Sequence, residues 1–183
     1  MTALIIIGVI VALIVLYVIG TYNSLVGLRN KVEDSWAQIE VLLKRRADLI
    51  PNLVETVKGY AKHEEGTLTG VIEARNKALS ATTPEEEMKA AGEVTQALTR
   101  LLALTESYPE LKANENFMDL QNNLKDTEDK ISFSRQFYND SALKYKDLVQ
   151  MFPSNIIAKL FNFKPAPFFE ASEADRAVPQ VKF

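Results

Sequence analysis

The distribution of apolar and polar residues divides this chain into two very different parts. No charged side chain precedes Arg29, and residues 3–19 consist almost entirely of Ile, Val, Leu and Ala. A helix that starts at Ala3, passes the end of this run at Ile19 and reaches Tyr22 would be about 30 Å long, which is the thickness of the hydrocarbon layer of a bilayer. The rest of the chain has the polar composition of a soluble domain. We therefore expect residues 1–24 to form a single transmembrane anchor.

The apolar segment has the features of a retained anchor more than those of a removable signal. A secretory signal normally starts with Lys or Arg and ends at a small-residue cleavage site. Here no basic side chain precedes the apolar run, and residues 20–24 contain no A-x-A pattern. A buried helix of a soluble protein is a poorer alternative, because such helices seldom run this long without a polar face.

The positions of Lys and Arg around the span predict its orientation. The side with more Lys and Arg close to the span usually faces the cytoplasm. Only the terminal amine precedes this span, whereas Arg29 and Lys31 follow it. This bias predicts an N-terminus outside the cytoplasm and a cytoplasmic domain.

Residues 25–152 are expected to form an all-α domain, because no run after the anchor sustains the alternation that is typical of strands. Thr83, Pro84 and Glu86 combine a hydroxyl cap, a first-turn proline and a capping-box glutamate, which together mark the start of a helix. Pro51 should kink the first helix, or mark a join between two helices with Asp48 as the cap. Start and stop signals predict helices from the anchor to about residue 63, over about 67–79, over about 84–107, and from 114 or 116 to about 150.

Apolar residues in the first, third and last of these helices recur at spacings of three and four. This is the seam pattern of coiled coils and helical bundles. With short connections, an antiparallel four-helix bundle in up-down-up-down order is the simplest arrangement. The predicted fold is therefore all-α, with one transmembrane helix that continues into an antiparallel four-helix bundle.

One polar residue interrupts a seam. Arg46 occupies an apolar position of the first helix, while Glu128 and Arg135 lie next to the seam of the last helix. One hypothesis is an interior polar network in which Glu128 pairs with Arg46 or Arg135, and which fixes register more than it adds stability. The other is that Arg46 extends to solvent while its stem covers apolar surface.

Residues 153–183 form an aromatic-rich tail that contains Phe161, Phe163, Phe168 and Phe169. Aromatic residues with scattered lysines are typical of segments that bind a membrane surface or a partner. In an up-down-up-down bundle the last helix ends near the point where the first leaves the membrane, so the tail could lie against the bilayer or a neighbouring subunit. The alternative is that these phenylalanines close the end of the bundle's own core.

Several of these motifs resemble the bacterial LemA family, over essentially the whole chain. The longest is residues 44–61, KRRADLIPNLVETVKGYA, and further matches are residues 22–30, YPELKA at 108–113, Thr127 with Glu128, Arg135 with Tyr138 and Asn139, Phe152 with Pro153, and residues 168–170.

The resemblance implies a single-pass protein of the bacterial inner membrane with a short outside N-terminus and a helical bundle inside the cell. It also implies a connection with envelope organisation and, in one branch of the family, with magnetosome membranes. No catalytic residues are assigned to the family, so the resemblance supplies none.

The chain lacks the residue sets of common catalytic and metal sites. It contains no cysteine and one histidine, His63, which cannot complete a zinc site, a di-iron site or a Ser-His-Asp triad. No glycine-rich phosphate loop is present, and 24 acidic against 21 basic residues give no field that favours nucleic acid. We therefore expect no enzymatic activity, cofactor, metal or nucleic-acid partner.

The remaining prediction is a non-enzymatic membrane scaffold. Gly8 and Ala12 have the small-xxx-small spacing that lets transmembrane helices approach closely, which gives weak support for a homo-oligomer. The alternative is a regulatory or adaptor subunit of a membrane enzyme such as a protease. The expected partners are thus the lipid bilayer, further copies of the chain and, in the alternative, another membrane protein.

Overall fold

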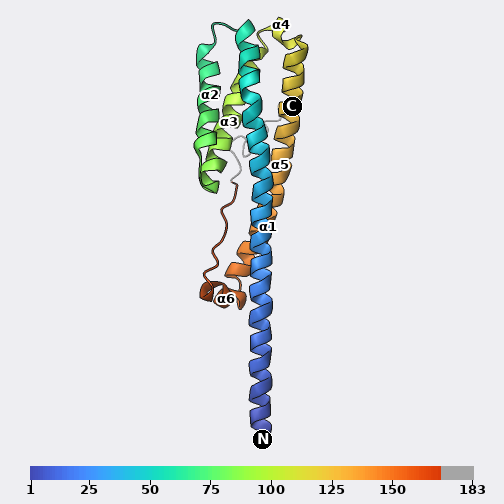
Figure 1. Ribbon diagram of the computed structural model, residues 1–183, viewed down its shortest axis with the longest axis vertical. Helices are drawn as coiled ribbons and strands as arrows, with labels where there is room; N and C mark the ends of the chain where they lie inside the picture. The colour runs from blue at the N-terminus through green and yellow to red at the C-terminus, as the bar shows by residue number, and fades with distance from the viewer. Residues whose placement is uncertain (170–183) are drawn as a thin grey trace, which may run out of the picture. The chain divides into compact units, whose positions relative to one another are not determined.

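The computed structural model describes residues 1–169, and these residues form helices and connections without a strand. The predicted all-α class with a long apolar N-terminal helix is confirmed. Figure 1 shows the six helices, which are α1 (Thr2–Tyr60), α2 (Glu65–Ser80), α3 (Pro84–Thr105), α4 (Pro109–Lys112), α5 (Glu115–Gln150) and α6 (Ser154–Leu160).

The helix ends agree with the sequence signals to within about three residues. The capping box is present at the start of α3, where the Thr83 hydroxyl accepts from the Glu86 backbone N–H and the Glu86 carboxylate accepts from the Thr83 N–H. At its other end, α3 stops at Thr105. The backbone N–H groups of Glu106 and Ser107 donate to the carbonyls three residues earlier, rather than to those four residues earlier as in an α-helix. The short helices α4 and α6 were not predicted.

The prediction of a helix join at Asp48 is wrong, because α1 continues through Pro51 without interruption. Proline has no N–H, so the carbonyl of Ala47, four residues earlier, loses its usual helical donor. The structure supplies another donor from α2, since Arg75 Nε donates to the Ala47 carbonyl over 2.7 Å. The helix therefore tolerates Pro51 because a neighbouring side chain satisfies the carbonyl that proline leaves unpaired.

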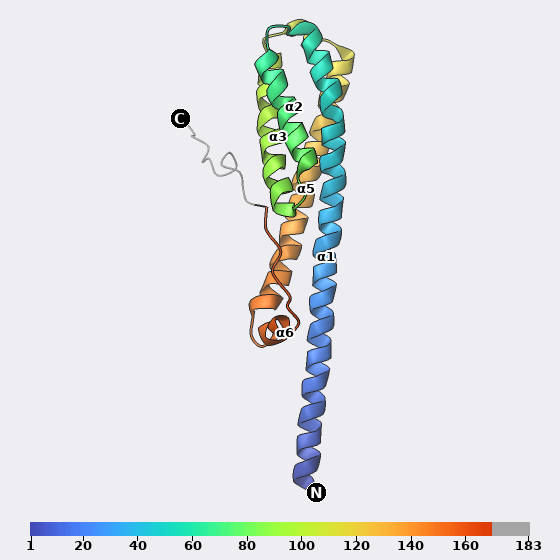
Figure 2. The same cartoon turned by 60° about the vertical axis from the view of Figure 1, so that its left-hand side comes forward.

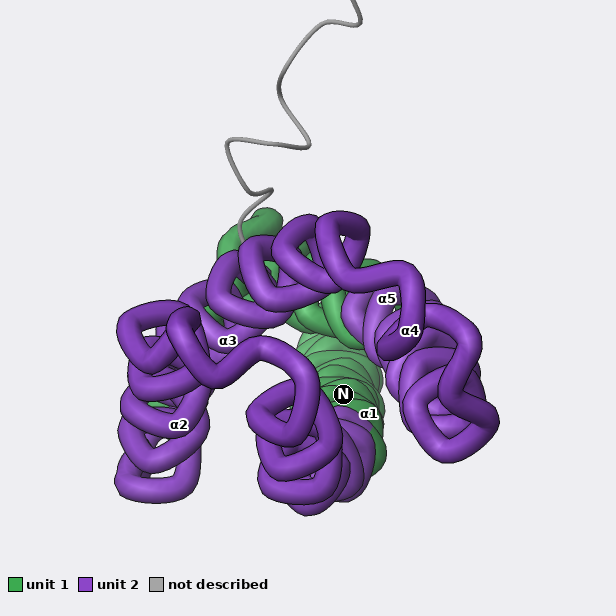
Figure 3. Tube along the Cα trace, turned by 90° about the horizontal axis from the view of Figure 1, so that it is seen from above, with its two compact units in different colours: residues 1–38, 136–168 green, residues 39–135, 169–183 purple. Residues whose placement is uncertain are grey.

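The described residues fall into two compact units, coloured separately in Figure 3. Unit 1 comprises residues 1–38 and 136–168, and unit 2 comprises residues 39–135 together with Phe169. Both α1 and α5 contribute residues to each unit. The units follow packing rather than chain order, so the predicted boundaries at residues 24 and 152 stay a prediction.

Unit 2 is an antiparallel helical bundle. The C-terminal part of α1, α2, α3 and the N-terminal part of α5 run alternately in opposite directions, as the two views in Figures 1 and 2 agree. Their apolar stripes meet in one core, and α4 closes it with the fully buried Leu111. The fully or almost fully buried members of this core include Ile50, Leu53, Val57, Val71, Val94, Leu98, Leu101, Phe117 and Leu124.

Unit 1 is built from the N-terminal part of α1, the C-terminal part of α5, and α6. The Trp36 and Tyr138 rings meet edge to face with centroids 5.4 Å apart, and the Tyr138 hydroxyl donates to the Pro167 carbonyl over 2.8 Å. These contacts join α1, α5 and the segment after α6 into one packed body.

A left-handed residue ends α6. Asn162 has φ 57°, and its N–H donates to the Lys159 carbonyl while the Phe163 N–H donates to the Ala158 carbonyl. This is the Schellman arrangement, in which a residue with positive φ satisfies the last carbonyls of a helix. It reverses the chain direction at Asn162, so that Phe163 is buried against the unit whereas Phe161 is not.

Candidate functional site

The apolar segment of α1 is exposed along its whole length. Residues 2–20 have no buried member, and Val18 is the one that is half-buried. Ala3 and Ile19 are exposed, and so is Tyr22. Among residues 1–169, α1 is the one helix long and apolar enough to cross a membrane, and none of its most apolar stretch is covered by protein. An exposed apolar surface of this size is typical of sites that contact a membrane or another protein.

Protein packing along α1 starts where this segment ends. Thr21 and Leu25 are buried in unit 1. The Tyr22 ring meets the rings of Phe161 and Phe163 edge to face, with centroids 4.8 Å and 5.7 Å apart. About two turns further along, the Arg29 guanidinium lies 5.5 Å from the centroid of the Phe163 ring. The end of the apolar segment therefore contacts two aromatic side chains from the segment that follows α5.

The four phenylalanines singled out in the tail do not share one environment. Phe163 and Phe169 are buried, and Phe168 is half-buried. A cation lies over each of the last two rings, with Lys146 Nζ 5.3 Å from the Phe168 centroid in unit 1 and the Arg135 guanidinium 4.5 Å from the Phe169 centroid in unit 2. Phe161, by contrast, remains 48% exposed. Residues 170–183 of the predicted tail lie outside the described residues.

Sequence reasoning singled out Phe161 but missed four further exposed apolar residues around α6. These four are Met151, Phe152, Ile156 and Leu160, which lie in the turn from α5 into α6 or on α6 itself; together with Phe161 they are called the α6 surface from here on. The signal that could have revealed them is the helical spacing of four between Ile156 and Leu160, while the intervening Ile157 and Ala158 are buried.

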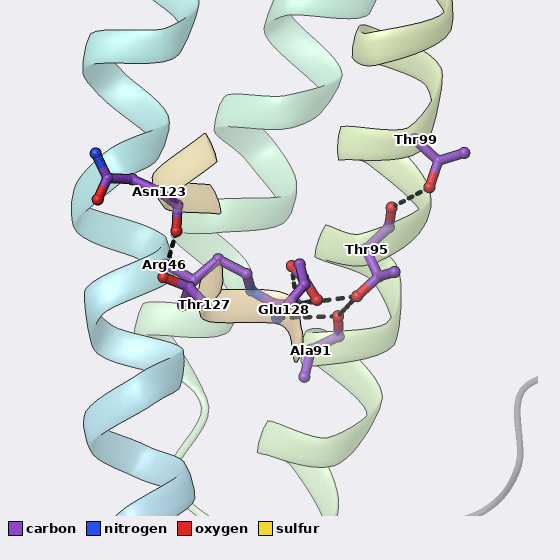
Figure 4. A network of polar contacts seen from close by, with 7 residues as sticks. All are labelled: Arg46, Ala91, Thr95, Thr99, Asn123, Thr127 and Glu128. Atoms are coloured by element: carbon purple, nitrogen blue, oxygen red, sulfur yellow. Dashed lines mark hydrogen bonds and ion pairs between the residues drawn. The ribbon is translucent and has the colours of Figure 1, made fainter. Parts of the chain in front are cut away.

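The structure places Arg46 in the interior of unit 2. Its side chain is 3% exposed, and Nη1 donates to Glu128 Oε1 over 3.0 Å and to Thr95 Oγ1 over 2.9 Å. Nη2 donates to the Ala91 carbonyl over 3.1 Å, as Figure 4 shows. The guanidinium thus joins α1 to α3 and α5. Its contacts with Thr95 and the Ala91 carbonyl could not be read from the sequence.

The three predicted network residues are in different surroundings. Glu128 is paired with Arg46 but 32% exposed, so water reaches part of its carboxylate. Arg135 lies over the ring of Phe169. The neighbouring Arg45 approaches Asp126 at 3.8 Å, and both side chains are about half exposed, so this second pair contributes little to stability.

Two adjacent glutamates at the start of α3 have opposite pKa shifts. Hydrogen bonds from the Thr82 and Thr83 backbone N–H groups and the Thr82 hydroxyl lower the pKa of Glu86 below its usual 4.5. Burial, with a smaller contribution from the charge of Glu40, raises the pKa of Glu87 above 4.5. Carboxylates with perturbed pKa values can mark catalytic sites, but they also arise from ordinary folding contacts.

The surroundings of Glu87 favour a structural origin for its shift. Glu87 and Glu40 line a hollow of about 260 Å³ beside Arg46, and the other residues around it include no Ser, Thr, Cys or His. Within residues 1–169 no group of three or more His, Cys, Asp or Glu side chains is placed to hold a metal ion. The hollow therefore offers a perturbed acid without a hydroxyl, thiol or imidazole beside it, and without a metal partner among the described residues.

Comparisons with known proteins relate most of the chain to one family. A family model described as the LemA family matches residues 35–183. Magnetosome protein MamQ of Magnetospirillum gryphiswaldense is 24% identical over 189 residues, which is 87% of this chain and 70% of that protein. Protein LemA of Metamycoplasma hominis is 25% identical over 162 residues, 86% of this chain and 73% of that protein. Magnetosome protein MamQ 2 of Paramagnetospirillum magneticum is 25% identical, and the match spans 66% of its length.

Proposed function

The chain belongs to the LemA family, and we propose that it is a single-pass membrane protein whose helical bundle acts as a non-enzymatic scaffold in the bacterial cell envelope. In this proposal the apolar part of α1 anchors the chain in the inner membrane. Further copies of the chain associate with it, and the bundle provides a surface for envelope components.

One observation carries this proposal, namely the apolar part of α1. It has the length of a transmembrane span, contains no charged side chain, and is not covered by the protein's own packing. A helix buried in a soluble core would be covered, so this alternative does not account for the segment. One relative is named Magnetosome protein MamQ, and the connection with magnetosome membranes that the family resemblance implies supports a membrane role for this chain as well.

A scaffold role agrees with the chemistry of the described residues. The most deeply buried ionic group of the described residues, the Arg46 guanidinium, donates hydrogen bonds to three partners within the bundle. The perturbed acid Glu87 lines a hollow that contains no hydroxyl, thiol or imidazole side chain. The names of the relatives state no reaction. These observations favour binding and assembly over catalysis.

A second candidate is a regulatory or adaptor subunit of a membrane enzyme such as a protease. The observation that favours it is a groove between α1 and α2 in unit 2, with an apolar floor of Val54, Leu68 and Ile72. Charged residues of both signs line its rim, including Lys58 and Glu65. A groove of this kind suits a helix or an extended segment of another protein.

The mass of the full chain, purified in detergent and measured by native mass spectrometry, tests the scaffold proposal against the alternative. A homo-oligomer supports the scaffold. A monomer, or a monomer in stoichiometric complex with another membrane protein, contradicts it, and the complex would favour the adaptor role.

Gly8 allows a sharper version of this test. A side chain added at Gly8 meets no atom of the chain within 4 Å, so a loss of assembly in Gly8→Ile reports a contact with another copy. Ile10→Phe is the matched control, since residue 10 lies on the opposite side of the helix from Gly8 and Ala12. We expect the first variant to weaken the oligomer and the second to leave it intact; equal effects of the two would contradict association through Gly8.

Orientation can be measured because the chain contains no cysteine. In spheroplasts, a membrane-impermeant maleimide should label Thr2→Cys but not Glu106→Cys, an exposed position at the end of α3. After lysis both should react. Labelling of Glu106→Cys before lysis would place the bundle outside the cytoplasm.

A further inference from the structure

The α6 surface presents large apolar side chains to the surroundings of a chain that is anchored in a membrane. We propose that the α6 surface inserts into the headgroup region of the same bilayer that α1 crosses, as a second, interfacial membrane contact. This inference rests on the proposed function, because it requires the apolar part of α1 to span the bilayer. It adds a lipid-binding site that the anchor itself does not imply.

The exposure of these residues is selective. Phe152 is 79% exposed and Leu160 75% exposed, whereas Ile157 and Ala158, on the other face of α6, are buried in unit 1. A short amphipathic helix of this kind is held against the protein by one face and leaves the other face unpaired. Aromatic and aliphatic side chains on such a face are typical of segments that lie in the plane of a membrane interface.

The position of α6 along α1 agrees with the level of the membrane boundary. At about 1.5 Å per residue, the part of α1 from Thr2 to Thr21 is about 30 Å long, which fills the hydrocarbon layer. Tyr22 then lies at the boundary between hydrocarbon and headgroups, where tyrosine is enriched. Since the Phe161 ring lies 4.8 Å from the Tyr22 ring, the α6 surface is at the same level. Figure 2 shows α6 beside this part of α1.

The charges of the segment favour lipid headgroups as the occupant. From Met151 to Phe169 the chain contains Lys159 and Lys164 and no acidic residue, and both lysines are exposed. Arg29, beside the Phe163 ring, adds a third cation near the same boundary. Cations next to apolar side chains bind anionic lipid surfaces more strongly than apolar side chains alone.

Local backbone geometry keeps the surface pointed outward. The left-handed conformation of Asn162 directs Phe163 into the unit, and there it contacts Tyr22 and Arg29. Ser154, Ile157 and Ala158 hold the inner face of α6. The protein therefore presents the α6 surface in a fixed orientation and needs no folding step on contact with lipid.

Depth-dependent fluorescence quenching of the full chain in vesicles tests this inference. Single cysteines at Phe152 and Leu160 would be labelled with the environment-sensitive fluorophore NBD, in vesicles of phosphatidylethanolamine and phosphatidylglycerol. Lipids that carry a doxyl quencher either near the headgroup or deep in the acyl chain report the depth of each label, and iodide reports exposure to water. Ile10→Cys is the control for the span, and Phe133→Cys, at an exposed phenylalanine of α5 in unit 2, is the control for an apolar residue away from the α6 surface.

We expect the labels at Phe152 and Leu160 to be quenched by the shallow doxyl lipid, the label at Ile10 by the deep one, and the label at Phe133 by iodide. If the Ile10 label is quenched by lipid while the Phe152 and Leu160 labels are quenched by iodide, the inference fails and the anchor stands. If the label at Ile10 is quenched by iodide, the proposed span fails first. Labels at Phe152 and Leu160 that neither iodide nor lipid can reach would show a protein in place of lipid, and this also overturns the inference.

Discussion

The hydrogen bond between Arg75 and the Ala47 carbonyl should matter only because residue 51 is a proline. Ala47 is 6% exposed, so water cannot readily replace a lost donor at its carbonyl. Arg75→Met keeps an apolar stem and removes the donor, which leaves that carbonyl unpaired. In Pro51→Ala, the new N–H at position 51 donates to the same carbonyl through the ordinary helical bond. Arg75 is then no longer the only donor to the Ala47 carbonyl.

The magnitude follows from the geometry. The donor is charged and the bond short at 2.7 Å, for which a loss of about 1.5–3 kcal/mol is typical. Because Arg75 is half-buried rather than fully buried, we expect Arg75→Met to lower the free energy of unfolding by about 1.5 kcal/mol. In the Pro51→Ala background the same change should cost about 0.5 kcal/mol or less, since a substitution without a lost buried partner has an effect of that size.

The assay is a double-mutant cycle on the full chain in detergent micelles, with urea unfolding followed by circular dichroism at the helical band. The expected coupling energy between positions 51 and 75 is about 1 kcal/mol. Arg100→Met, at an exposed arginine on α3, is the control and should have the same small effect in both backgrounds. The reasoning is refuted if Arg75→Met costs as much with alanine at position 51 as with proline.

Four further predictions concern the Arg46 network, two glutamates at the start of α3 and the end of α6. Arg46→Ala should lower the free energy of unfolding by about 3 kcal/mol, because it removes three hydrogen bonds and leaves a carboxylate without its cation. Glu128→Gln keeps an acceptor for Arg46 and should cost about 1 kcal/mol. Urea unfolding measures both losses, and equal losses would contradict the central role of Arg46 in the network. The lowered pKa of Glu86 stabilises the fold above pH 4.5 and this stabilisation is lost as the pH falls through its folded-state pKa, so Glu86→Gln should lower the melting temperature at pH 7 and have little effect at acidic pH. The raised pKa of Glu87 has the opposite effect: the stability that its neutral form contributes is fully present below pH 4.5 and is lost as the pH rises through the raised pKa. Glu87→Gln should therefore be more stable than the parent at pH 7 and equally stable near pH 4. A lower stability of this variant at pH 7 would argue against burial as the cause of the pKa shift. Asn162→Val should cost about 1–2 kcal/mol because φ is positive there, and Asn162→Gly should be tolerated; similar effects of these two on thermal unfolding would rule out backbone strain.

The parts of the fold that depend on local chemistry were predictable from the sequence. The apolar run of α1 is specified by composition alone, and the start of α3 by the hydroxyl of Thr83 and the carboxylate of Glu86, which lie three residues apart. The position of Arg46 in an apolar seam made a buried ion pair one of two open hypotheses. In each of these cases the information lies within a few turns of one helix.

The remaining features depend on contacts between distant segments. The continuation of α1 through Pro51 is supported by Arg75, 24 positions later in the sequence. Local propensity could not show this contact, and the join at Asp48, one of the two alternatives it left at Pro51, is wrong. The helix α6 has only seven residues, so the spacing of four between Ile156 and Leu160 is not enough by itself to predict a helix. The different environments of Phe161 and Phe163 depend on the backbone of Asn162, because asparagine permits a left-handed conformation without requiring it.

The Arg46 network also limits the motions by which the bundle of unit 2 could transmit a signal. Helical receptors can signal when one helix slides past another by a turn, which displaces side chains by about 5.4 Å. A slide of this size between α1 and α5 would take the guanidinium away from the Glu128 carboxylate, and away from Thr95 and the Ala91 carbonyl if α3 did not follow. No neighbouring position could replace all three acceptors at once. Piston-like signalling within this bundle is therefore disfavoured, and changes in its state should come from partners that bind its surface.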